Sequence, residues 1–125
     1  MKKIISTPNA PAAIGPYSQA VEINGTLYIS GQLPINPVSG KIETTDIEGQ
    51  TKQVLANIGA VLAAAGYTYS DVVKSTVFMS DLANFAGMNA EYLKVYESES
   101  PARSTFAVKA LPLGALVEIE TIAVI

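Results

Sequence analysis

The stretch AVEINGTLYIS, residues 20–30, decides how the chain begins to fold. Asn24 and Gly25 stand between two runs of strand-forming residues, and this dipeptide is the strongest short signal for a two-residue hairpin turn. We therefore predict an antiparallel hairpin over residues 20–30. Residues 31–41 follow with prolines and Gly40, which break regular structure and favour a short loop.

A helix is predicted to begin near Thr45 and to end at Gly66. Thr45 and Glu48 have the spacing of a capping box, and Gly66 provides a C-terminal stop. Between them, apolar residues recur with helical spacing and define one face to bury. The members of this stripe are Val54, Leu55, Ile58, Val61, Leu62 and Ala65.

The second half of the chain predicts one strand, one helix and two further strands. Residues 72–79 are rich in β-branched residues, and Asn84 can cap a helix that runs through Tyr96. Residues 103–110 and 116–124 are two strand patterns joined by a turn that contains Leu-Pro-Leu-Gly. The apolar stripe of this helix consists of Phe85, Met88, Tyr92 and Val95.

The predicted order is therefore ββαβαββ, in one domain that spans residues 1–125. Two helices with single apolar faces and a mainly antiparallel sheet define an α+β fold, with both helices most simply packed on the same face of the sheet. Hydrophobic residues make up 49% of the chain and charged residues only 15%. This apolar surplus predicts a homo-oligomer in which a neighbouring subunit covers the second sheet face.

The composition also excludes several classes of function. The formal net charge of −3, without a cluster of basic residues, argues against nucleic-acid binding. With no histidine and no cysteine, a Ser-His-Asp triad, a cysteine nucleophile and a usual zinc site are impossible, so we expect no metal and no cofactor. The sequence shows no signal-peptide pattern and no membrane span, which favours a cytoplasmic location.

Arg103 is the single arginine, and it stands at the start of an otherwise small or apolar strand pattern. Its planar fork of donors can bind both oxygens of a carboxylate. An arginine at a surface or a structural interface is an equally good interpretation of its position alone. Arg103 is therefore a candidate carboxylate-binding residue.

Glu118 and Glu120 lie in the apolar stretch LVEIETIAVI, and their spacing places both on one face of a strand. Solvent-exposed glutamates on an edge strand would have the same pattern, whereas a desolvated carboxylate becomes a better proton acceptor. If residues 103–110 pair directly with the last strand, a four-residue turn puts Arg103 on the same face as both glutamates. A five-residue turn puts them on opposite faces, and the sequence leaves both registers open.

Two further candidates precede the predicted helix. Gly15-Pro16 turns the backbone just before Tyr17, whose phenol could face a cleft or lie hydrogen-bonded at a sheet corner. Ser30 and Gly31 end the hairpin and offer a hydroxyl next to an uncovered backbone. Ordinary turn chemistry explains the same two residues.

Four motifs span nearly the whole chain: APAAIGPYSQA (residues 10–20), SGQLPINP (30–37), VVKSTVFMSDLANFAGMN (72–89) and PARSTFAVKALPLGALVEIE (101–120). Together they resemble the RidA/YjgF family. The resemblance implies a chorismate-mutase-like subunit in a trimeric barrel with clefts between subunits. It also implies hydrolysis of 2-aminoacrylate and related enamine or imine acids, products of PLP-dependent dehydratases, to 2-oxo acids and ammonia.

The positions that match the family's site are Tyr17, Ser30, Gly31, Asn89, Arg103, Thr105 and Glu118. By resemblance, Arg103 binds the carboxylate, backbone groups of Gly31 and Thr105 hold the imine nitrogen, and Glu118 activates water. Tyr17, Ser30 and Asn89 shape the pocket. Thr105 departs from the pattern, because many members have cysteine there. A non-enzymatic trimer that binds 2-oxo acids is the alternative, and RNA cleavage fits this acidic chain poorly.

Overall fold

The structure, a computed structural model, describes residues 1–125 and contains one six-stranded sheet with two α-helices. A two-stranded sheet and three short 3-10 helices complete it. The elements are β1 (Lys3–Ile5), β2 (Ala20–Ile23), β3 (Thr26–Gln32), β4 (Ile35–Asn36), β5 (Lys41–Ile42), α1 (Ile47–Ala65), η1 (Tyr69–Asp71), β6 (Val72–Met79), η2 (Leu82–Asn84), α2 (Phe85–Val95), β7 (Ala102–Ala107), η3 (Pro112–Gly114) and β8 (Val117–Val124).

The predicted ββαβαββ order is confirmed by β2, β3, α1, β6, α2, β7 and β8, in a mostly antiparallel sheet. Asn24 (φ 50°) and Gly25 (φ 77°) form the predicted hairpin turn, across which Ile23 pairs with Thr26. The sequence interpretation missed β1. It also missed the small β4–β5 hairpin, which lies in and next to the stretch assigned to a loop. Strands of two or three residues carry too little alternation to detect.

Both helix starts differ in detail from the prediction. Asp46, and not Thr45, caps α1, because its side chain accepts a hydrogen bond from the Gly49 amide at 3.1 Å. Asn84 occupies the cap position of α2 but makes no capping hydrogen bond. At the other end of α1, Gly66 has a φ of 82°, the left-handed conformation expected of a glycine stop.

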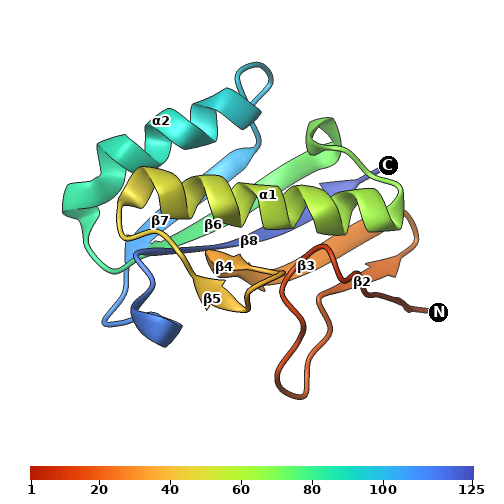
Figure 1. Cartoon of the computed structure of the whole chain (residues 1–125). Helices are drawn as coiled ribbons and strands as arrows, with labels where there is room; N and C mark the ends of the chain where they lie inside the picture. The colour runs from red at the N-terminus through yellow and green to blue at the C-terminus, as the bar shows by residue number, and fades with distance from the viewer.

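Figure 1 shows α1 and α2 side by side on one face of the sheet. The apolar residues of both helices and of the facing sheet surface form one core cluster of 21 buried residues. Neither helix is both long and apolar enough to cross a lipid bilayer. The sheet face without helices, here called the open face, carries Ile4, Tyr28, Lys74, Phe78, Phe106, Glu118, Glu120, Ile122 and Val124.

The predicted pairing of the last two strands is wrong. The strand order is β1, β2, β3, β8, β6 and β7, so that β6 separates β7 from β8. β7 lies at the edge and pairs with β6 in parallel, because α2 connects them as a crossover helix. β8 then pairs antiparallel with β6 and β3. Neither of the two registers considered for direct β7–β8 pairing occurs.

Candidate active site

Arg103 and Glu118 lie on opposite faces of the sheet. Arg103 pairs with Ser75 and Thr105 with Val77, and both β6 partners are buried beneath the helices. Glu118 pairs instead with Phe78, on the open face. Paired residues on neighbouring strands point to the same side. One chain therefore carries two separate groups of candidate site residues.

The first group surrounds Arg103. Its guanidinium carbon lies 4.7 Å from the centre of the Tyr92 ring and 5.6 Å from that of Phe85. Its Nη1 atom approaches the sulfur of Met88 at 4.0 Å. All three neighbours belong to the apolar stripe predicted for α2, since positions 85, 88 and 92 lie on one side of a helix. The apolar stripe predicted for α2 therefore also contacts the guanidinium of Arg103.

No carboxylate neutralises Arg103. The single ion pair in the chain joins Lys94 to Glu91, at 2.6 Å. Arg103 borders a hollow of about 490 Å³, which Asn89 also lines together with Tyr92, Leu93, Tyr96, Ser100 and Pro101. An arginine without an acidic partner at such a hollow is suited to bind an anion, and its fork suits a carboxylate best.

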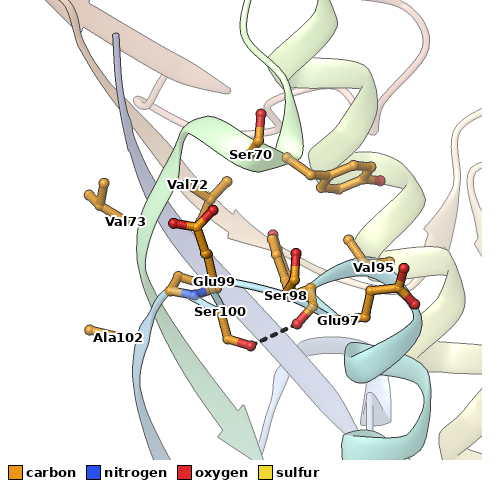
Figure 2. Close-up of a pocket in the computed structure, with 12 residues that line it drawn as sticks. Ser70, Val72, Val73, Val95, Glu97, Ser98, Glu99, Ser100 and Ala102 are labelled. Carbon is orange, nitrogen blue, oxygen red and sulfur yellow. Dashed lines mark hydrogen bonds between the residues drawn. The ribbon is translucent and has the colours of Figure 1, made fainter.

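A second hollow adjoins this one at the end of α2 (Figure 2). It has a volume of about 560 Å³, and Glu97 and Glu99 lie on its wall with several serines. Ser100 Oγ donates a 2.7 Å hydrogen bond to the Tyr96 carbonyl there. With two carboxylates and no cationic side chain in its lining, this hollow does not suit an anionic ligand.

The second group joins Gly31 to Glu118 at the other face. The β3–β8 register shifts between Ile29 and Gln32, which places Gly31 in an irregular part of the strand. A Cβ atom on Gly31 would lie 3.0 Å from the carboxyl carbon of Glu118 and would overlap one carboxylate oxygen. Only glycine therefore lets this carboxylate rest against the β3 backbone.

Glu118 has an unusual protonation equilibrium for a glutamate. Burial raises its pKa above the ordinary value, and the negative charge of Glu120 raises it further. Glu120 itself is exposed two residues along β8. The predicted sharing of one face by the two glutamates is confirmed by their pairing with Phe78 and Thr76 of β6.

Tyr17 lies in the segment that leads into β2, and Ser30 lies in β3, which holds that segment in place. Ser30 Oγ donates a 2.6 Å hydrogen bond to the Ser18 carbonyl, so the hydroxyl already fixes the chain next to Tyr17. The Tyr17 ring is 51% exposed and lines a separate hollow with the N-terminal strand. Neither side chain contacts Arg103 within one chain.

Thr105 is half-buried on the face that also carries Arg103, and its hydroxyl has no hydrogen-bond partner in the chain. The sequence interpretation missed Tyr92, Phe85 and Met88 as neighbours of Arg103. Their spacing predicts a buried stripe whether they pack against carbon or against a guanidinium. Only the parallel pairing of β7 with β6 brings Arg103 onto this side of the sheet beside α2.

An α+β fold with an unpaired arginine in a hollow defines a protein suited to bind small carboxylates. Comparison with known proteins assigns the chain to a family. The chain matches the family model described as Endoribonuclease L-PSP over residues 7–125, and it belongs to this family, the RidA/YjgF family. The 2-iminobutanoate/2-iminopropanoate deaminase of Bos taurus is 50% identical over 99% of this chain and 90% of its own.

Two further relatives agree with this assignment. Reactive Intermediate Deaminase A, chloroplastic, of Arabidopsis thaliana is 50% identical over 98% of this chain, which spans 65% of the length of that protein. The crystal structure of the Rid family protein YyfA from Yersinia pestis superposes with a TM-score of 0.97 at 53% identity. That superposition covers 100% of both chains.

Proposed function

We propose that this protein hydrolyses 2-aminoacrylate and related enamine or imine acids to 2-oxo acids and ammonia. The observation that carries the proposal is the unpaired guanidinium of Arg103 at the hollow it shares with Asn89. Relatives that are half identical over nearly the full chain are named Reactive Intermediate Deaminase A and 2-iminobutanoate/2-iminopropanoate deaminase, which supports the same reaction here. The substrate class is a small acid whose carboxylate this arginine can bind.

The site is proposed to form between subunits of a homotrimer. Arg103 and Thr105 lie on one face of the sheet, whereas Gly31 and Glu118 meet on the other. The two groups complement each other chemically but cannot converge on one small molecule within a chain. A neighbouring copy can supply the missing half, and ring symmetry would repeat the arrangement at each contact. The trimer itself is proposed from the family resemblance.

In the proposed mechanism, Arg103 binds the carboxylate, and backbone groups of Thr105 and Gly31 hold the imine nitrogen. An enamine acid first tautomerises to the imine. Glu118 then accepts a proton from water while the water oxygen bonds to the imine carbon, and it passes this proton to the nitrogen. The hydroxyl proton of the resulting carbinolamine moves to the amino group, the C–N bond breaks, and ammonia leaves as the carbonyl forms. Tyr17, Ser30 and Asn89 shape the pocket. Positioning water next to an already electrophilic carbon lowers the entropic part of the barrier.

A coupled assay tests this proposal. A serine or threonine dehydratase generates the enamine, and the release of the 2-oxo acid is followed with and without this protein. Acceleration of 2-oxo acid release is the expected result. If the assembled protein binds a 2-oxo acid without accelerating its release, the non-enzymatic alternative holds instead. Degradation of RNA by the same preparation would support the activity that the family description names.

Gly31→Ala is expected to lower kcat about tenfold to a hundredfold while the protein stays folded. The added methyl group displaces the Glu118 carboxylate, and a shift of about 1 Å in a reacting group can cost on the order of 10²-fold in rate. The displaced atoms are the end of a flexible side chain, so unfolding in urea should change by less than about 1 kcal/mol. Gly40→Ala adds a methyl group in open space but at a φ of 72°, so it controls for backbone strain: it should lose stability and keep kcat. An unchanged kcat in a folded Gly31→Ala protein would contradict the role of the contact with Glu118.

Glu120→Gln is expected to shift the acidic limb of the kcat/KM–pH profile to lower pH. Glu118 acts as a base only when it is ionised, and Glu120 contributes to its raised pKa. Removing that charge lowers the pKa of Glu118, so the active form appears at lower pH. Burial still raises the pKa, so the limb should move only in part. If the acidic limb stayed in place or moved to higher pH, it would not report the ionisation of Glu118.

The same raised pKa has a defined effect on folding. Glu118 binds its proton more tightly in the folded chain than in the unfolded chain. Its contribution to stability is therefore complete below the unfolded pKa, about 4.3, and is lost as the pH rises through the higher folded value. Glu118→Gln removes this loss, so the variant should be at least as stable as the wild type near neutral pH.

A further inference from the structure

Arg103 is held by aromatic rings and not by an acid. The Tyr92 ring centre, 4.7 Å from the guanidinium carbon, is the nearer of its two aromatic contacts, and Tyr92 is only 5% exposed. Phe85 is farther away, at 5.6 Å, and 38% exposed. An aromatic face attracts the cation without using up its N–H donors in an ion pair. Tyr92 is therefore the main fixed support of the guanidinium.

We propose that Tyr92 is a positioning residue for Arg103, whose ring holds the guanidinium in the orientation that receives a substrate carboxylate. The role in catalysis rests on the proposed function, because it requires that Arg103 binds the substrate. The positioning itself is a property of the folded chain and can be measured without any reaction.

A row of packed aromatic rings fixes Tyr92 in turn. Its ring centre lies 4.7 Å from that of Tyr96, and Tyr96 packs edge-on against Tyr69 at 5.8 Å. The Tyr69 hydroxyl donates a 2.6 Å hydrogen bond to the Leu55 carbonyl within α1. Offset and edge-on ring pairs stabilise a defined geometry beyond the burial of their area. The support beneath Arg103 therefore extends through α2 to the longer helix.

The aromatic face of Tyr92, and not its hydroxyl, carries this role. The hydroxyls of Tyr92, Tyr96 and Ser75 are buried near one another, yet none has a hydrogen-bond partner in the chain. Burial raises the pKa of both tyrosines. A hydroxyl without a bond does not orient its ring, so phenylalanine should replace Tyr92 without loss.

Arg103 is the single arginine of the chain, so its Nε–Hε group gives the one arginine side-chain signal in a ¹⁵N–¹H spectrum. In the wild type this signal should be shifted upfield by the ring beneath it and should show restricted motion. Tyr92→Phe should keep both properties. Tyr92→Leu should move the signal toward its position in the unfolded chain and lower its heteronuclear NOE. Tyr92→Met provides the same test if the leucine variant fails to fold.

The matched control is Tyr67→Leu. Tyr67 is also buried, 3% exposed, but its hydroxyl donates a hydrogen bond to Glu22 of β2. Three strands separate β2 from β7 in the sheet. This variant should lose stability and leave the arginine signal unchanged. The proposal would be overturned if Tyr92→Leu and Tyr92→Met left the arginine signal unchanged. It would also be overturned if Tyr67→Leu moved the signal equally.

Kinetics connect the positioning to the reaction. Loss of the aromatic support should raise KM roughly 2- to 30-fold in Tyr92→Leu, with kcat unchanged within about twofold, while Tyr92→Phe stays close to the wild type. A fall in kcat at constant KM would contradict a role in carboxylate binding. If the spectra respond as expected but the wild type shows no deaminase activity, the proposed function fails and the positioning of Arg103 by Tyr92 stands.

Discussion

Replacing Arg103 by alanine is expected to lower kcat/KM for the imine acid about 10²- to 10³-fold. The side chain is the one group in its hollow that can form two parallel bonds to a carboxylate, and truncating one partner of a hydrogen-bonded charge pair costs about 2–5 kcal/mol. Coupled 2-oxo acid release and direct binding of 2-oxobutanoate measure the loss. Both should fall together, because the interaction exists in the bound ground state as well as in the transition state.

Arg103→Lys is the matched variant for this experiment. It keeps the charge but loses the planar fork, so the loss should be intermediate, about tenfold. The fold should survive both changes, since Arg103 has no ion pair and its aromatic contacts are worth only about 0.5–2 kcal/mol. Thermal unfolding verifies this. Full activity in a folded Arg103→Ala protein would refute carboxylate binding by this residue.

Mixing two inactive variants should restore about one quarter of the wild-type activity. Arg103→Ala lacks one half of the proposed site and Glu118→Gln lacks the other. In randomly mixed rings, each contact receives an intact Arg103 half and an intact Glu118 half with probability of about one half each. Joint unfolding and refolding of equal amounts, followed by the coupled assay, measures the recovery.

The control mixture combines Arg103→Ala with the double variant that carries both changes. It contains no intact Arg103 and should remain inactive under the same refolding protocol. Recovery only in the first mixture would support a site shared between neighbouring chains. No recovery, in a mixture shown to contain hetero-oligomers, would mean that both residues act from the same chain, against their placement on opposite faces of the sheet.

Local signals predicted much of the fold correctly. Asn24-Gly25 fixes a hairpin because both residues adopt positive φ without large cost, and Gly66 ends α1 for the same reason. The helix stripes emerged from apolar spacing alone. The capping residue of α1 was misplaced by one position, because Thr45 and Asp46 can both cap and only the path of the chain selects between them.

The sequence did not predict the pairing of β7 with β6, and the reason is physical. A turn rich in proline and glycine between two strand patterns normally indicates a hairpin. Here β7 follows the crossover helix α2 and pairs with β6, while the segment of η3 carries the chain past β6 to the other side. Strand order depends on long-range packing, which residue periodicity does not encode.

The members of the candidate site were proposed from the sequence, whereas their arrangement comes from the structure. The family motifs pointed to Arg103 and Glu118, and the structure places them on opposite faces. Tyr92 was recognised only as part of an apolar stripe, because aromatic residues that support a cation follow the same spacing as core residues. No local pattern in the sequence separates these two roles.

A protein whose two reactive surfaces face away from each other is, by itself, only a pair of unmatched pieces. If turnover needs both pieces, dilution that drives the copies apart should abolish catalysis while every chain remains folded. The rate per chain would then report how many copies have found each other, and selection for the chemistry would also be selection for self-association.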